Sequence, residues 1–339
     1  MKLSFLISAH TDAPHLRRLI ESLPEGSEFF VHIDAKSDIT PFIKELSRPD
    51  VHFISHRVNV VWGSINEVEY QMEMVREALR CSPDYLITLS GMDYPVWSNK
   101  KIMDYFHSLN GCNVLQGLRI TLSDPKNVNY REFRLLSTRQ WRKGSMGSKF
   151  RVAMRKTASM LGIKKALSIK ARGKHYDLYK GAAWWAITPQ LAVKALYEWD
   201  ENKKLRRYFS TSFCPAETFL QTVAFNSSFS DTCILTEGQF TTLQALTPLT
   251  FIDYSNGVLI LNANDYDRIV ASGKMFCRKT ITGESDALMD MIDKKRKENS
   301  RTSGSRNFEV CGRERSRTFR GTTQRVCGRS PQYGSIHRE

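Results

Sequence analysis

Glu217 is the first candidate for chemistry in this sequence. It lies in the segment FCPAETFLQT at 213–222, two residues after Pro215 and directly before an apolar run. Proline favours the first position of a helix, so the segment predicts a helix start with Cys214 as its N-cap. A carboxylate at such a turn could accept a proton from a hydroxyl group. It could equally serve only to complement the helix dipole, which is worth about 0.3–1 kcal/mol.

Two adjacent cations, Arg278 and Lys279, form a second candidate for chemistry. They lie in the segment FCRKT at 276–280, inside an otherwise apolar stretch. Two cations at such a position could clamp a diphosphate. Charge on the protein surface would give the same pattern, so the pair alone leaves both interpretations open.

Two acidic segments, one at the end of an expected strand and one at an expected helix start, form the third group of candidates. The segment HIDAKSD at 32–38 carries Asp34 at a strand end, where nucleotide-binding sheets hold ribose hydroxyls. The DYD at 265–267 has the composition of a metal-binding acid pair, but at a helix start we expect it to complement the dipole. Neither GxGxxG after the first strand nor GxxxxGK[ST] is present, which disfavours dinucleotide enzymes and P-loop ATPases.

The elements that must position these residues follow an alternating order over residues 1–120. Short apolar runs predict strands at 3–9, 28–34, 51–55, 85–90 and 113–117, and apolar spacing predicts helices at 13–23 and 64–80. Ser64 and Glu67 have the spacing of a capping box for the second helix. Strands separated by helices predict a mainly parallel α/β sheet, whose ligands gather at the carboxyl ends of the strands. This directs attention to His10, Asp34, Trp62 and the turn at 90–95.

The remaining chain is less regular. A helix with Phe150, Met154 and Leu161 on one side is expected in the stretch 133–176, a strand at 182–188, and extended backbone at 249–262. Further helices are expected near 189–199, at Asp265 and over 284–297. We predict one domain over 1–298, with a nucleotide-sugar half at 1–120 and an acceptor half at 121–298. The tail, 299–339, is rich in Arg, Ser and Gly and has few large apolar residues, so we expect disorder there.

Charge and cysteine content limit the possible partners and location. The net charge is +15, and residues 133–176 contain thirteen Lys or Arg and no Asp or Glu, which indicates either an anionic partner or a solvated basic face. The seven cysteines are scattered without a CxxC, which favours buried thiols over disulfides or a zinc site. The apolar run at the start is too short for a signal peptide, so we expect a first buried strand and a cytoplasmic location.

Six segments taken together identify a protein family far more specifically than any one of them does alone. HIDAKSD, VVWGSINEVE, LITLSGMDYPVWSN, KGAAWWAIT, FCPAETFLQT and MFCRKT occur in this order. The set resembles the core-2/I-branching glycosyltransferases of family 14, which include peptide O-xylosyltransferases, over about residues 1–295. The resemblance implies a GT-A-type fold with a Rossmann-like sheet, a UDP-sugar donor, and transfer with inversion at the anomeric carbon.

The resemblance also implies roles for individual residues. Glu217 matches the catalytic base, and Lys279, with Arg278 beside it, matches the cation that neutralises the diphosphate in place of a metal, so no metal cofactor is expected. The implied donor contacts are His10, Asp34, Lys36, Trp62, Asp93, Arg278 and Lys279. The implied acceptor contacts are Gln116, Arg131, Arg134 and Trp185, although Trp184 and Trp185 could instead pack the sheet.

Departures from the family pattern leave the substrates open. Ala216 stands where the family often has Asp, and Asn256 stands where animal branching enzymes have a second diphosphate-binding arginine. We expect transfer of N-acetylglucosamine or xylose to a glycan, polysaccharide or lipid-linked acceptor. We also hypothesise that residues 140–174 contact the anionic inner membrane face. The alternative is a non-catalytic basic protein that binds nucleic acid or a membrane surface, although specific nucleic-acid binding is not expected.

Overall fold

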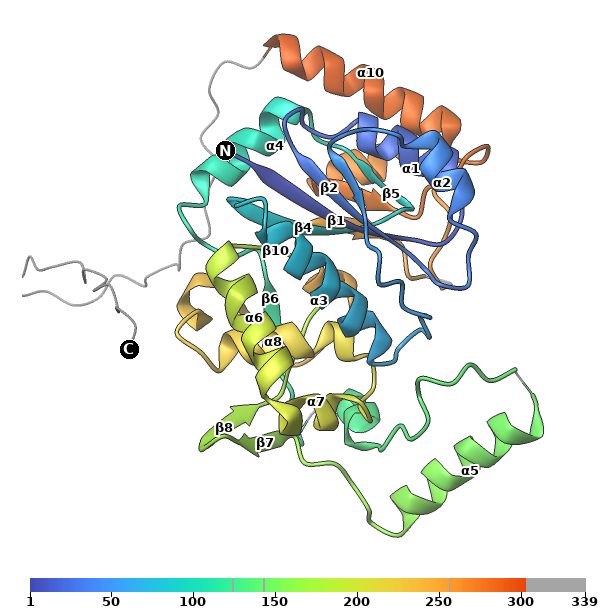
Figure 1. Cartoon of the computed structure of the whole chain (residues 1–339), viewed down its shortest axis with the longest axis vertical. Helices are drawn as coiled ribbons and strands as arrows, with labels where there is room; N and C mark the ends of the chain where they lie inside the picture. Colours follow the sequence, from blue (N-terminus) through green and yellow to red (C-terminus); the bar gives the residue numbers. More distant parts are fainter. Residues whose placement is uncertain (124, 143, 256, 303–339) are drawn as a thin grey trace, which may run out of the picture. The chain divides into compact units, whose positions relative to one another are not determined.

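The central sheet is built around β1 (Leu3–Ala9), whose side chains are almost all buried. The computed structural model describes residues 1–302 except 124, 143 and 256. β1 pairs in parallel with β2 (Glu28–Ile33) and β4 (Tyr85–Ser90), and β3 (Val51–Phe53) pairs in parallel with β2. β10 (Ala186–Ile187) adds an antiparallel edge, giving the order β10-β4-β1-β2-β3 (Figure 1). The predicted α/β class with a mainly parallel sheet is confirmed.

Alternate side chains of β1 enter two different cores, as the two-residue period of a strand requires. Leu3, Phe5 and Ile7 pack with helices α1 (Ala13–Glu21), α2 (Thr40–Glu45) and α4 (Asn99–Ser108). Leu6 belongs to the core that contains α3 (Asn66–Leu79), α6 (Pro189–Glu201) and α8 (Phe219–Phe225). Helices therefore cover both faces of the sheet, which is why its strands are apolar on both sides.

A second sheet joins distant parts of the chain. β5 (Asp93–Pro95) pairs antiparallel with β13 (Phe276–Arg278), which pairs in parallel with β12 (Thr250–Ile252). This register sets Asp93 opposite Arg278, although the two residues are 185 positions apart in the sequence. Because β10 and β13 pair with strands of the first 120 residues, the halves proposed from the sequence share their sheets.

The other elements complete the fold around these two sheets. The strands are β6 (Gln116–Arg119), β7 (Ser168–Ala171), β8 (Lys174–Asp177), β9 (Tyr179–Lys180) and β11 (Ile234–Thr236). The helices are α5 (Met146–Met160), α7 (Lys203–Phe209), α9 (Tyr266–Ala271) and α10 (Asp286–Thr302). Short 3-10 turns are η1 (Pro125–Arg131), η2 (Pro215–Glu217), η3 (Ser230–Thr232), η4 (Gln244–Leu246) and η5 (Ala263–Asp265). Within the described part of the chain, no helix has the length and apolarity needed to cross a membrane.

Several predicted elements differ in extent from the observed ones. β1 and β4 have the predicted bounds, whereas 249–262 is a strand only at Thr250–Ile252. The stretch after Cys214 begins with the 3-10 turn η2 before α8. At DYD, Asp265 caps its turn and bonds Arg268, as the dipole interpretation predicts. Apart from the end of α10, the predicted tail lies outside the described residues.

The predicted capping box at Ser64 and Glu67 is wrong. α3 begins at Asn66, and Ser64 Oγ accepts the backbone N–H of Asn66 at 3.3 Å, not that of Glu67. Glu67 Oε2 accepts the N–H of Gly63 at 2.9 Å, because Gly63 adopts a left-handed backbone with φ of 71°. The carboxyl group of Glu67 is therefore directed to the loop that precedes the helix.

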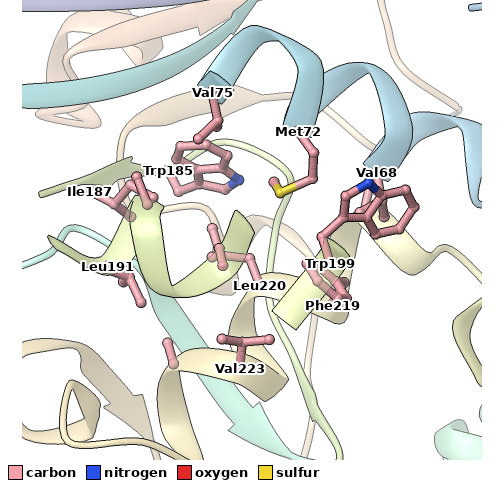
Figure 2. Close-up of a cluster of buried hydrophobic side chains, with 14 of the residues drawn as sticks. Val68, Met72, Val75, Trp185, Ile187, Leu191, Trp199, Phe219, Leu220 and Val223 are labelled. Atoms are coloured by element: carbon pink, nitrogen blue, oxygen red, sulfur yellow. The ribbon is translucent and has the colours of Figure 1, made fainter. Parts of the chain in front are cut away.

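Trp185 forms the centre of the core between α3 and α6. It is 0% exposed and lies among Met72 and Val75 of α3, Ile187 of β10 and Leu191 of α6 (Figure 2). A side chain enclosed in this way cannot contact an acceptor. The predicted acceptor role of Trp185 is therefore wrong, and the packing alternative holds.

Replacing the two neighbouring tryptophans should affect stability unequally. We expect Trp185→Ala to lower the free energy of unfolding by about 3–5 kcal/mol, because it leaves a large void in the core. Trp184→Ala should cost clearly less, because Trp184 is only partly buried. Urea denaturation of both variants measures the difference. Equal losses would contradict this assignment of the core.

Candidate functional site

The carboxyl ends of β1, β2 and β4 open into a cavity of about 680 Å³. Six residues predicted from the sequence line it: His10, Asp34, Lys36, Trp62, Arg134 and Arg278. Five of them were predicted as donor contacts and one as an acceptor contact. The position agrees with the rule that ligands of parallel sheets bind outside the carboxyl ends of the strands.

Asp34 organises the end of β2. Its Oδ1 accepts the backbone N–H of Lys36 at 3.0 Å, and its Oδ2 lies 3.1 Å from Lys36 Nζ. Burial lowers the pKa of His10, Asp34 opposes that shift, and the cations Lys279, Arg278 and Lys36 add to it. A neutral imidazole beside a fixed carboxylate offers both donors and acceptors to sugar hydroxyls or a base edge.

Arg278 is held on the cavity wall by a fully buried acid. Its Nη1 donates to Asp93 Oδ1 at 3.1 Å, and its guanidinium lies 5.2 Å from the centre of the Trp184 ring. Asp93 Oδ2 accepts the Ser90 N–H at 2.8 Å and Trp184 Nε1–H at 2.9 Å. Burial raises the pKa of Asp93, and Arg278 opposes that shift.

The predicted donor contact of Asp93 therefore needs correction. Asp93 is 0% exposed and does not line the cavity, whereas Arg278 and Trp184 do. A buried carboxylate needs a partner cation, and Arg278 supplies it. Asp93 positions the two side chains that face the cavity instead of meeting a ligand itself.

Lys279 lies beside the cavity rather than on its wall. Its backbone carbonyl accepts the N–H of Leu261 at 2.8 Å, and its side chain is close enough to lower the pKa of His10. The sequence assigned the main cation to Lys279 and a helping role to Arg278. The geometry gives Arg278 the wall position and leaves Lys279 as a second cation near His10.

Glu217 is fixed at the 3-10 turn η2, whose N-cap Cys214 has a left-handed backbone with φ of 42°. The carbonyl of Glu217 accepts the Gly181 N–H at 2.8 Å. The pKa of Glu217 is raised to about 8, mainly by burial and in addition by Glu67, while Lys180 opposes both. Lys180 is itself buried, and its Nζ donates to Asn127 Oδ1 at 2.9 Å.

Glu67 is a second carboxyl group that sequence reasoning missed as a site residue. It lines the cavity, and burial raises its pKa to about 7, while the hydrogen bond from Gly63 opposes that shift. α3 packs against η2, and a Cβ added at Gly63 would lie 3.5 Å from Cys214 Sγ. The loop of Glu67 thus contacts the residue that caps the turn of Glu217.

Two half-buried tyrosines, Tyr254 and Tyr70, respond to the charges of the acids and of Arg278. Burial raises the pKa of Tyr254; Glu217 adds to the shift and Arg278 opposes it. Burial likewise raises the pKa of Tyr70, and there Glu67 adds to the shift while Arg278 again opposes it. Glu67, Tyr70 and Arg278 line the cavity, whereas Glu217 and Tyr254 are not among the residues of its wall. The predicted base Glu217 is therefore linked to the cavity through Glu67, which raises its pKa, and does not form part of the lining itself.

A basic wall closes the cavity on the side of the stretch 133–151. The guanidinium of Arg134 lies 4.6 Å from the centre of the Phe213 ring and bonds Asn129 Oδ1 at 3.0 Å. Three further residues of this wall were not predicted: Arg139, Trp141 and Arg151. The run of thirteen cations without an acid was the sequence signal for them, but it could not show which side chains face the cavity.

The other predicted acceptor residues do not line the cavity. Gln116 Nε2 donates to Thr236 Oγ1 at 2.8 Å and to the Ala245 carbonyl at 3.0 Å, which ties β6 to its neighbours. Arg131 ends η1, and its carbonyl accepts the Lys165 N–H at 2.8 Å. Asn256, the suspected substitute for a diphosphate-binding arginine, lies outside the described residues.

One group with metal-ligand spacing lies at the opposite end of the sheet. Candidate ligand atoms of Glu28, His52 and Cys81 lie within 4.8 Å of one another. Glu28 begins β2, whereas the cavity lies where β2 ends. Glu28 also pairs with His52 at 2.6 Å and with Lys2 at 3.0 Å. The hydrogen bond with His52 and the ion pair with Lys2 account for the position of Glu28, and we assign no metal to the cluster.

Comparison with known proteins adds to the geometry. A family model described as Core-2/I-Branching enzyme matches residues 3–257. Xylosyltransferase 1 of Rattus norvegicus is 21% identical over 245 residues, which cover 69% of this chain and 27% of that protein. Xylosyltransferase 2 of Homo sapiens is 22% identical over 245 residues, covering 69% and 26%. The chain thus spans about a quarter of the length of these relatives.

Solved structures show a weaker likeness. Glucosyl-3-phosphoglycerate synthase from Mycobacterium tuberculosis is 10% identical, with a TM-score of 0.32, over 73% of this chain and 75% of that chain. A likeness of this degree says nothing about function.

The raised pKa of Glu217 should make folding stability depend on pH. The folded state binds this proton more tightly than the unfolded state, whose carboxyl has the ordinary pKa of 4.5. The resulting stabilisation is present below pH 4.5 and is lost as the pH rises through about 8. We expect Glu217→Gln to be more stable than the parent by roughly 1–3 kcal/mol at alkaline pH, and nearly equal to it in acid. Urea denaturation at both pH values measures this, and a variant destabilised at both would contradict it.

Proposed function

Because the chain belongs to the Core-2/I-branching enzyme family, whose members are glycosyltransferases, we propose that it transfers a sugar from a UDP-sugar to a hydroxyl group of a glycan or polysaccharide. One observation carries the proposal: Glu67 and the fixed Arg278 line one cavity at the carboxyl ends of the strands, and Glu67 raises the pKa of the nearby Glu217. The family and the xylosyltransferase relatives support N-acetylglucosamine or xylose as the sugar.

Glu217 is the proposed general base. The acceptor hydroxyl donates its hydrogen bond to the Glu217 carboxylate, and its oxygen attacks the anomeric carbon from the face opposite the departing UDP. One C–O bond forms, the bond to UDP breaks, and the proton passes to Glu217. A single displacement inverts the anomeric centre and needs no covalent enzyme intermediate. A base of raised pKa holds the proton more strongly, which favours this transfer.

Glu67 is proposed to keep Glu217 basic. Like charges in a buried site disfavour ionisation of both carboxyls, so the negative charge of Glu67 raises the proton affinity of Glu217. Lys180 acts in the opposite direction and stops the base from remaining protonated throughout the working range. Glu67 is thus a positioning and tuning residue that acts through Glu217.

Arg278 is the proposed counter-charge for the leaving UDP, with Lys279 as the second cation. Asp93 fixes the guanidinium before the substrate arrives, so little reorganisation is needed when negative charge develops on the diphosphate. A fixed donor of this kind is worth about 3–4 kcal/mol in comparable sites. Two cations would make a divalent metal unnecessary, as we expected from the resemblance.

Two sets of cavity residues are proposed to hold the two substrates, the UDP-sugar donor and the acceptor. His10, Asp34 and Lys36 would hold the uridine and ribose, with the exposed Trp62 beside them. Arg134, with the neighbouring basic wall, would face the acceptor. The alternative of a non-catalytic basic binding protein would require neither the carboxyl pair nor the Asp93–Arg278 pair.

Removing the base should separate catalysis from binding. We expect Glu217→Gln to lower the transfer rate by about 10²–10⁴-fold, because the amide cannot accept the acceptor proton. UDP affinity, measured by calorimetry, should stay within a few-fold of the parent value. Near-normal turnover in the variant would remove Glu217 from this role.

The cations should replace a metal at the diphosphate. We expect UDP-sugar turnover to persist in EDTA, and Arg278→Met to lower kcat by roughly 10²-fold or more. Lys274→Met, a lysine near the same strand that does not line the cavity, is the matched control. A strict requirement for Mn²⁺, or an Arg278→Met variant with normal kcat, would show that the counter-charge lies elsewhere.

A further inference from the structure

Helix α5 (Met146–Met160) has its apolar side chains on the outside. Met146 is 88% exposed, Phe150 is 64% exposed and Met160 is 87% exposed. They lie in one stripe with the exposed Ala153 and Thr157, at alternating four- and three-residue steps. A surface helix of a globular protein normally turns its apolar stripe toward the core, so this arrangement is inverted.

The opposite side of α5 carries cations that face the protein. Arg155 Nε lies 3.2 Å from Glu132 Oε2, and Arg151 lines the cavity. The sequence predicts that Phe150, Met154 and Leu161 share one side of a helix, and the structure shows why that side is not a core face. The inward positions are occupied by Arg151, which lines the cavity, and by Arg155, which pairs with Glu132, whereas Phe150 and Leu161 are exposed.

Exposed apolar residues continue past the end of the helix. Leu161 is 71% exposed and Ile163 is 53% exposed. Figure 1 shows α5 at the margin of the ribbon with a loop on each side. The apolar surface of α5, defined as Met146, Phe150, Met160, Leu161 and Ile163, is therefore larger than scattered single residues would give.

The charges around this surface are all positive. Lys149 and Lys156 lie seven residues apart, on one flank of the stripe, and are exposed. Lys164 follows the apolar residues and is also exposed. No Asp or Glu occurs between residues 133 and 176. Apolar side chains flanked by lysines are the composition of helices that lie in the interface of an anionic membrane.

We infer that the apolar surface of α5 docks on an anionic lipid bilayer, with Phe150 and its neighbours entering the boundary between headgroups and acyl chains and the lysines meeting lipid phosphates. A second copy of this chain is a poorer occupant, because two such faces would bring lysines together with no acid to offset them. Docking here would also hold the cavity near the membrane, because Arg151 of the same helix lines it. A cavity held near the membrane would suit a lipid-linked acceptor; this last step rests on the proposed glycosyl transfer, whereas the docking itself does not.

Vesicle cosedimentation of the full chain tests this docking. Vesicles of phosphatidylcholine are compared with vesicles of equal parts phosphatidylcholine and phosphatidylglycerol. We expect binding only to the second kind. The double variant Phe150→Ser with Met160→Ser should lower the partition coefficient at least tenfold, because each lost apolar side chain is worth roughly that factor. The double variant Lys149→Gln with Lys156→Gln should lower it roughly fivefold or more.

Matched controls distinguish the effect of the α5 surface from the effect of removing any exposed apolar residue or lysine. Val193→Ser removes an apolar side chain of similar exposure, 56%, from α6. Lys203→Gln with Lys204→Gln removes two exposed lysines from α7. Both controls should bind vesicles as the parent does. Hydrolysis of UDP-sugar in solution should be unchanged in every variant. If the proposed function is wrong, the parent will show no hydrolysis, and the vesicle assay will still report on docking.

Three outcomes would overturn the inference. The parent could fail to bind the anionic vesicles. The α5 variants could bind as strongly as the parent, which would assign lipid binding to other basic residues such as those of 301–339. The parent could elute as a dimer in light scattering while the Phe150→Ser, Met160→Ser variant elutes as a monomer, which would assign the surface to self-association.

Discussion

The repulsion between Glu67 and Glu217 is the interaction on which the proposed chemistry depends. Burial raises the pKa of both carboxyl groups, and the charge of Glu67 raises that of Glu217 further, so each holds a proton more strongly than it would in water. The fold maintains this unfavourable contact by packing α3 against η2 and by fixing Glu67 to the Gly63 N–H. Strain of this kind persists only where the surrounding structure enforces it, which is typical of sites that use a base near neutral pH.

The cost of burying a charge also explains the position of Arg278 on the cavity wall. Asp93 is buried without access to solvent, so it must be paired, and the register of β5 with β13 places Arg278 directly opposite. The guanidinium is thereby held on the cavity wall over the Trp184 ring. A carboxyl of raised pKa, Glu67, and a fixed cation, Arg278, on the wall of one cavity provide both signs of charge, as a displacement with an anionic leaving group requires.

The sequence was informative where local pattern decides structure. Continuous apolar runs predicted β1 and β4 with the correct bounds, and the strand-end rule found Asp34 and its neighbours. Glu67 could not be assigned, because the spacing of Ser64 and Glu67 also fits a capping box, and the left-handed backbone of Gly63 decides between the two. Trp184 and Trp185 were indistinguishable in the sequence, because neighbouring side chains of an extended segment face opposite sides and only the packing shows which side is the core.

The pH dependence of UDP-sugar hydrolysis, compared between the parent and Glu67→Gln, tests the central claim most directly, because water as acceptor uses the same base. The account predicts that kcat/KM of the parent rises with pH toward about 8, the raised pKa of Glu217. In Glu67→Gln the rise should move to lower pH by roughly one unit or more, because a neutral amide no longer opposes ionisation of Glu217. A parent profile that is already flat above pH 4.5, or a variant profile that coincides with that of the parent, would contradict the account.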